Sequence, residues 1–184
     1  MRTAKSSLWR YLWAVLGKFQ KTMMAVSSIC IVVMIFVAVV ARYIFKSDFY
    51  GSEELIQMFA FWLYFMGAAQ GSREKSQISA DILTCYITNK KWNISVQFVR
   101  ELITVAISLL VSWWGIQFVA WSFHMLPKST VFRLPMLIPH SAVGLGFVLM
   151  SFYHTVYLIQ NFKDLVRVFR GQDVSAAQAF EGEA

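Results

Sequence analysis

Three histidines are the side chains best suited to chemistry, and two of them fall close to the same connection. His124 lies near the end of one long apolar run and His140 near the start of the next. Two histidines on antiparallel helices can ligate a haem iron. The alternative, which their position near the helix ends favours, is an ordinary packing role with no ligand. His154 lies about 21 Å further along its helix than His140, where we expect it to be packed or interfacial.

Thiol, nucleophilic and phosphate chemistry have little support in the sequence. Cys30 lies within an apolar run, Cys85 lies in a connection, and no Cys-x-x-Cys motif is present. A thiol–disulfide oxidase is therefore not indicated. The residue spacing contains no recognisable nucleophile–base pair, phosphate loop or metal-binding cluster. We expect that the chain is not an enzyme and has no cofactor of its own.

The composition indicates which elements position these residues. Of 184 residues, 58% are hydrophobic and 15% are charged, whereas soluble domains are about a quarter charged. Four uncharged runs, at residues 22–41, 55–72, 102–126 and 136–161, are long enough to cross a hydrocarbon core of about 30 Å as helices. Open strands would leave backbone groups unpaired in lipid. The sequence therefore predicts an all-α integral membrane protein with a four-helix transmembrane domain at residues 22–162.

Lysine and arginine are distributed unevenly around these runs. Of 17 such residues, thirteen lie in the N-terminal segment, the connection at residues 73–101 and the tail, and four lie in the other two connections. Basic residues accumulate on the cytoplasmic side of membrane proteins. We therefore expect N-in/C-in topology in a bacterial inner membrane, with residues 42–54 and 128–133 facing the periplasm. The net charge of +7 is then a topology signal, and nucleic acid is not an expected partner.

The two ends of the chain carry separate predictions. Residues 1–21 repeat apolar side chains at helical spacing opposite a basic face. This pattern is typical of an amphipathic helix lying in the cytoplasmic membrane interface. A cytoplasmic extension of the first transmembrane helix accounts for the same residues, and both interpretations stay open. Residues 163–184 are expected to be a largely disordered cytoplasmic tail.

The four predicted transmembrane runs contain no Asp, Glu, Lys or Arg. Ionisable residues within membrane helices usually mark ion or proton pathways. Their absence argues that this chain does not carry a coupling ion or an ionic substrate by itself. An autonomous small transporter or channel is therefore the weakest interpretation.

Small residues are spaced four apart in three of the runs. Gly67 and Gly71 form a Gly-x-x-x-Gly pattern, and two further pairs, Ser108 with Ser112 and Ala142 with Gly146, repeat the spacing. Such residues let two membrane helices approach closely. The pattern is consistent with a membrane partner as well as with packing inside the chain.

An ordered set of residues between positions 42 and 83 adds a family resemblance. The set comprises Arg42-Tyr43-Ile-Phe45, Glu53-Glu54-Leu55, Trp62, Gly67-Ala68-Ala69, Arg73 and Ile78-Ser-Ala-Asp81-Ile-Leu83. Together with four predicted helices, it resembles the small membrane subunit (DctQ/SiaQ-like) of tripartite ATP-independent periplasmic (TRAP) transporters. The resemblance extends over roughly residues 20–165.

This resemblance implies a division of labour among three proteins. A large multi-span TRAP membrane subunit would hold Na⁺ and the substrate, and a periplasmic substrate-binding protein would deliver the substrate. The substrate would be an organic acid, such as a C4-dicarboxylate or sialic acid. This chain would be the scaffold subunit that braces the large subunit in the bilayer, and Na⁺ is expected in the partner subunit.

The site residues expected from the resemblance fall into three groups. Packing against the large subunit, or within the bundle, is expected from Trp62, Gly67, Ala68 and Gly71. An ion pair is expected between Arg42, which can snorkel at its helix end, and Glu53 or Glu54, which also suit a helix N-terminus. Docking of the periplasmic binding protein is expected from Lys46, Asp48, Tyr50, Lys128 and Arg133, for which an ordinary solvated loop is the alternative.

The alternative function is a haem-bearing four-helix membrane anchor of an oxidoreductase. It would use His124 and His140 as ligands, and it predicts a haem absorption band that is lost when either residue is replaced.

Overall fold

The computed structural model describes residues 2–47, 49–74 and 90–169. The described residues form four helices: α1 (Arg2–Tyr43), α2 (Ser52–Arg73), α4 (Lys90–Met125) and α5 (Leu137–Phe169). No strand occurs among these residues. The predicted all-α fold is confirmed.

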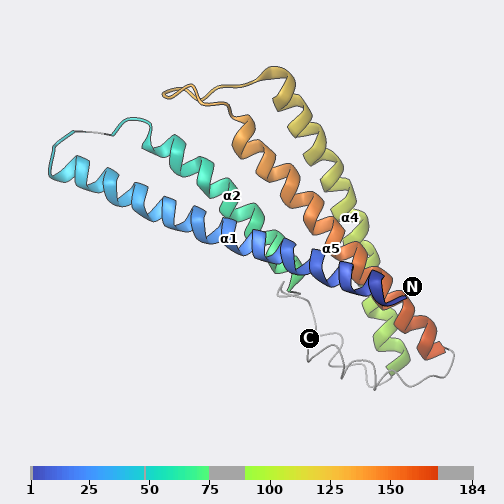
Figure 1. The fold of residues 1–184 in the computed structure, drawn as a ribbon. Coiled ribbons are helices and arrows are strands. Elements are labelled where there is room, and N and C mark those ends of the chain that lie inside the picture. The colour runs from blue at the N-terminus through green and yellow to red at the C-terminus, as the bar shows by residue number, and fades with distance from the viewer. Residues whose placement is uncertain (1, 48, 75–89, 170–184) are drawn as a thin grey trace.

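The helices are arranged as two hairpins, α1–α2 and α4–α5, which lie side by side (Figure 1). α2 packs against both α1 and α5, and α5 packs against α4. The order across the molecule is therefore α1, α2, α5, α4. We call the end that carries the α1–α2 and α4–α5 connections the loop end, and the opposite end, where α2 and α5 finish, the terminal end.

Three of the helices contain a stretch that is long and apolar enough to cross a membrane. These stretches are Tyr11–Tyr43, Ser95–Met125 and Leu137–Lys163. α2 has 22 residues but is less apolar, because Gln57, Gln70, Trp62 and Tyr64 are interspersed among its aliphatic residues. Three of the predicted spans are supported by length and composition, and the fourth, α2, stays a proposal.

Three helices extend beyond the apolar runs that were predicted to cross the membrane. α1 continues as one helix through residue 21, where the predicted interfacial segment ends. α4 begins at Lys90, before the predicted span at residue 102, and α5 continues to Phe169, beyond residue 163. Charged residues mark where a helix leaves the hydrocarbon, but the backbone hydrogen bonds that hold a helix together continue in water. Residues 170–184 of the predicted tail lie outside the described residues.

Small residues allow the closest helix contacts within the chain. A Cβ added at Gly146 of α5 would lie 2.8 Å from the Cβ and 3.1 Å from the carbonyl oxygen of Phe65 in α2. A Cβ added at Gly115 of α4 would lie 3.6 Å from the Cα of Gly144 in α5. The hydroxyl of Ser112 donates to the carbonyl of Phe147 at 2.7 Å. At these positions, the small-residue pattern joins helices of this chain to one another.

We expect Gly146→Ala to destabilise the packing of α2 against α5 by about 1–3 kcal/mol. The new methyl group would meet the backbone of Phe65, which cannot rotate away. Gly67→Ala is the matched control, since its methyl group would lie 3.8 Å from the flexible end of Met24, and its effect should stay within about 0.5 kcal/mol. Thermal unfolding in one detergent measures both. Equal unfolding temperatures for the two variants would contradict this packing.

Candidate functional site

The carboxylate of Glu54, in the first turn of α2, accepts four hydrogen bonds from the loop between α4 and α5. The hydroxyls of Ser129 and Thr130 donate to it at 2.6 and 2.7 Å. The backbone N–H groups of Val131 and Phe132 donate to it at 2.8 and 3.1 Å. We call these five residues the Glu54 clasp. The clasp joins the two hairpins at the loop end.

The loop that surrounds Glu54 is itself folded by backbone contacts. Lys128 and Pro135 form an antiparallel bridge, and the N–H of Ser129 donates to the carbonyl of Leu134 at 2.9 Å. Arg133 has a φ of 51°, a left-handed conformation that costs of order 1 kcal/mol for a residue other than glycine. The loop therefore presents its hydroxyl and N–H donors on one side, toward α2.

Gly51 allows the α1–α2 turn to approach this loop. Its φ is 87°, and an added Cβ would lie 2.4 Å from the Phe132 ring. Only glycine satisfies both the left-handed backbone and this close contact. The turn and the loop therefore form one surface at the loop end.

The hydrogen bonds of the clasp keep Glu54 ionised. Donation by Ser129 is the largest influence, with the loop's other donors acting in the same direction, and the pKa of Glu54 falls from 4.5 to about 2. Desolvation opposes this shift but does not outweigh it. Glu54 is therefore ionised at neutral pH.

A cleft of about 380 Å³ lies beside the clasp and brings together three of the predicted site residues. Arg42, Tyr50 and Glu53 all line it, with Val131 contributing from the α4–α5 loop. Of the two predicted acidic partners of Arg42, Glu53 shares this cleft with it, whereas Glu54 binds the loop. Both glutamates occupy the first turn of α2, where the helix dipole favours negative charge.

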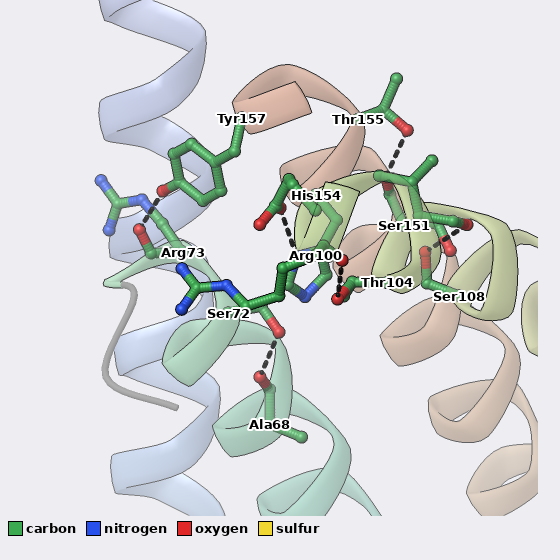
Figure 2. Close-up of polar contacts among 12 residues, drawn as sticks. Ala68, Ser72, Arg73, Arg100, Thr104, Ser108, Ser151, His154, Thr155 and Tyr157 are labelled. Atoms are coloured by element: carbon green, nitrogen blue, oxygen red, sulfur yellow. Dashed lines mark hydrogen bonds and ion pairs between the residues drawn. The ribbon is translucent and has the colours of Figure 1, made fainter. Parts of the chain in front are cut away.

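A second group of polar contacts joins α1, α2 and α5 at the terminal end. The guanidinium of Arg73 donates to the carbonyl of Trp13 at 3.2 Å and lies 5.5 Å from the centre of the Trp13 ring. Figure 2 shows the hydroxyl of Tyr157 directed at the backbone carbonyl of Arg73, to which it donates a hydrogen bond. The Trp13 ring also contacts Tyr153, at 5.0 Å between centroids. Arg73 therefore ends α2 and ties it to both neighbouring helices.

Glu101 of α4 and His154 of α5 form a pair that the sequence analysis did not predict. Their side chains are 12–13% exposed, and Nδ1 of His154 lies 3.0 Å from a carboxylate oxygen of Glu101. Glu101 lies within the candidate membrane stretch Ser95–Met125, about 36 Å along α4 from Met125. This depth places the pair near the edge of a hydrocarbon core of about 30 Å, where it links α4 to α5.

The two histidines considered as haem ligands lie in different surroundings. Nδ1 of His140 lies 2.8 Å from the hydroxyl of Ser122, and its ring contacts Phe118. His124 is exposed and lies two residues after the buried Ser122. Two residues turn a helix by about 200°, so His124 points away from the face of α4 that meets His140. The haem alternative is not supported, and no cluster of three metal-binding side chains occurs among the residues described.

The comparison with known protein families agrees with this architecture. Residues 31–164 match the family described as tripartite ATP-independent periplasmic transporters, DctQ component. The match covers most of the chain and includes α2, the Glu54 clasp and nearly all of α5. The chain belongs to the DctQ family. No curated protein matches it.

Membership of the DctQ family indicates the kind of protein to which this chain belongs and the proteins with which its family works. The DctQ family is a component of TRAP transporters and is not an enzyme family. DctQ proteins work with a DctM subunit and a substrate-binding protein. The family resemblance predicted from the residues between positions 42 and 83 is confirmed.

The residues predicted to pack against the large subunit lie on different sides of α2 in this DctQ chain. Gly67 faces Met24 of α1, and Trp62 and Gly71 are half-buried. Ala68 is exposed. Gly67 is therefore used inside the bundle, and Ala68 lies on the side that remains open to a partner.

The predicted docking residues gather at the loop end. Lys46, Tyr50, Lys128 and Arg133 are all exposed there, on the turn and loop that the Glu54 clasp joins. Asp48 lies outside the described residues. Their role in docking stays a prediction.

The clasp partners on the α4–α5 loop were missed by the sequence analysis. Ser129 and Thr130 are small polar residues in a short connection, a composition shared by most loops. One signal was the adjacent pair of hydroxyl groups on Ser129 and Thr130. An ionised Glu54 accepts hydrogen bonds only, so it requires donors of this kind nearby. The spacing alone does not reveal that the two connections meet.

We expect Glu54→Gln to loosen the α4–α5 loop of the DctQ chain. The amide nitrogen of Gln would face donors, so two of the four hydrogen bonds would be lost. Backbone amides at Val131 and Phe132 should exchange about tenfold faster, as measured by hydrogen–deuterium exchange with mass spectrometry. Glu53→Gln is the matched control, because Glu53 is exposed and not part of the clasp.

The protection of the α4–α5 loop against hydrogen exchange should also depend on pH. A carboxylate with a lowered pKa stabilises the folded state above its usual pKa of 4.5 and loses this effect as the pH falls toward 2. After correction for intrinsic exchange, protection of the loop should be constant from about pH 5 to 8. Loss of protection within that range, or equal exchange in both glutamine variants, would contradict the clasp.

Proposed function

We propose that this chain is the small scaffold subunit of a Na⁺-coupled TRAP transporter that imports an organic acid, such as a C4-dicarboxylate or sialic acid. The observation that carries the proposal is the DctQ match over residues 31–164. In this proposal the large DctM-type subunit holds Na⁺ and the substrate, and this chain braces it within the bacterial inner membrane.

The scaffold role is supported by how the four helices are joined. The Glu54 clasp joins the two hairpins at the loop end, and the hydrogen bond from Tyr157 to the carbonyl of Arg73 joins them at the terminal end. The Glu101–His154 contact holds α4 to α5 within the second hairpin. Gly146 brings α2 and α5 close together between these points. A helical bundle held in this way resists shear between its hairpins, which is what a fixed support for a moving subunit requires.

We further propose that α2 is the fourth transmembrane helix and that both termini are cytoplasmic. α2 lies between α1 and α5, each of which contains a candidate membrane stretch. Its 22 residues extend about 33 Å, the thickness of a hydrocarbon core. The basic residues Lys18, Lys21 and Arg73 share the terminal end, and the positive-inside rule assigns that end to the cytoplasm.

The loop end would then face the periplasm and meet the substrate-binding protein. Lys46, Lys128 and Arg133 would attract acidic groups of that protein, with Asp48 and Tyr50 as further contacts. Exposed charges at the edge of an interface mainly change association rates and their dependence on salt. The clasp supports this proposal because it holds the basic loop in one conformation.

The large subunit would contact the open side of α2, which includes Ala68 and the strongly exposed Tyr64. Trp62 and Gly71 would complete this contact at its edges. Aromatic and small residues together allow a membrane helix to pack closely.

Co-purification tests the proposed function. The chain, tagged at its C-terminus, is extracted from native membranes in mild detergent, bound proteins are identified by mass spectrometry, and an absorption spectrum is recorded on the same sample. We expect a colourless complex with a much larger multi-span membrane protein in fixed stoichiometry. A chain that elutes alone, or a haem absorption band, would contradict the proposal.

We expect Lys128→Glu to lower uptake in proteoliposomes that contain the complete transporter and its binding protein. The reduction should be about threefold or more at low ionic strength and should shrink as salt is added, since salt screens exposed charges. Lys163→Glu, an exposed change at the opposite end, is the matched control. Uptake unaffected by Lys128→Glu at every salt concentration would remove Lys128 from the docking surface.

A further inference from the structure

A shallow groove on α1 beside the end of α2 combines cationic and apolar walls. Its volume is about 610 Å³. Lys18, Lys21 and Arg73 line one part of it, and Ala25, Val26 and Ile29 line the remainder. We call this the α1 groove.

The two parts of the α1 groove are ordered along the helix. Lys18 and Ile29 are separated by about 16 Å along α1. The uncharged run of α1 begins at residue 22, so the change from cationic to apolar walls coincides with the proposed edge of the hydrocarbon core. An amphipathic molecule that lies parallel to the membrane normal also has its charged group at the membrane surface and its hydrocarbon chain in the core.

Arg73 is held at the groove by contacts that leave donors available. One nitrogen of its guanidinium donates to Trp13, and its Nε is buried with no hydrogen-bond partner among the described residues. A Cβ at Gly17 would lie 1.9 Å from a guanidinium nitrogen. The absence of a side chain at Gly17 therefore lets the guanidinium lie against α1.

The described residues neutralise the cationic part of the groove only in part. Glu74 lies 3.3 Å from Lys21, and hydrogen bonding from Gln70 and then Lys21 lowers the pKa of Glu74, so this carboxylate is ionised. In the described part of the chain, no ion pair is found for Lys18 or Arg73. Among the described side chains, three cations therefore face one anion.

We propose that the α1 groove binds an anionic phospholipid, with the phosphate against Lys18, Lys21 and Arg73 and one acyl chain along Ala25, Val26 and Ile29. This assignment rests on the proposed membrane placement of the chain. Basic pockets on the cytoplasmic side of membrane helices bind anionic headgroups in this manner. The bound lipid would fill the space between α1 and the end of α2 and would restrict the motion of α1.

Native mass spectrometry of the full chain in detergent tests the proposal. Phosphatidylglycerol and phosphatidylcholine with identical acyl chains are added in separate titrations. We expect one phosphatidylglycerol to be retained with an affinity about tenfold or more above that for phosphatidylcholine. Equal retention of both lipids would overturn the proposal.

Three variants locate the site. Lys18→Gln combined with Lys21→Gln should weaken phosphatidylglycerol binding by about tenfold. Lys46→Gln combined with Lys128→Gln removes the same charge at the opposite end and should leave phosphatidylglycerol binding unchanged. Ala25→Trp fills the apolar part without altering charge and should also displace the lipid. Binding that survives both groove variants would overturn the proposal.

Two further measurements separate the lipid from other occupants. Inorganic phosphate in large excess should not displace the lipid, because it cannot occupy the apolar part, and displacement would show a simple anion site. Lipid should also be retained in the purified transporter complex, since its loss there would show that the large subunit covers the groove. The lysine variants should still bind the large subunit, so failure of co-purification tests the proposed function separately.

Discussion

The fold depends on the polar contacts that hold its two hairpins together at both ends. At the loop end, the carboxylate of Glu54 receives four hydrogen bonds from the α4–α5 loop. At the terminal end, Tyr157 of α5 donates to the carbonyl of Arg73, where α2 finishes. In lipid, apolar helices gain little from leaving their apolar surroundings. Directional contacts at the helix ends therefore determine which hairpin faces align.

Close packing between the two ends follows from this alignment. Gly146 faces Phe65 across the α2–α5 contact, and Gly115 faces Gly144 across the α4–α5 contact. A shift of one helix along another would bring side chains into these positions and separate the backbones. The small residues and the terminal polar contacts therefore specify the same register. A bundle specified in this way is consistent with the scaffold role proposed for this DctQ subunit.

The sequence predicted the elements of this fold better than its contacts. Apolar runs predicted α1, α4 and α5 correctly because lipid requires long uninterrupted stretches of apolar residues. The apolar runs do not give the helix ends, since Lys90 and Phe169 lie in helices that continue beyond these runs. Glu53 and Glu54 were correctly placed at the start of a helix. That Glu54 would bind Ser129 was not predictable, because this contact joins residues 75 positions apart. Glu101 and His154 were missed for the same reason.

A distance measurement between the two hairpins tests the scaffold claim most directly. Spin labels are attached at Lys46 and Leu126, both exposed at the loop end, in a variant lacking the native cysteines and assembled with the large subunit. Double electron–electron resonance then gives the distance distribution with and without Na⁺, substrate and binding protein. The scaffold account predicts one distribution that is the same in every condition. A distribution that shifts or splits when Na⁺ and substrate are added would show that this chain moves during transport and would contradict the account.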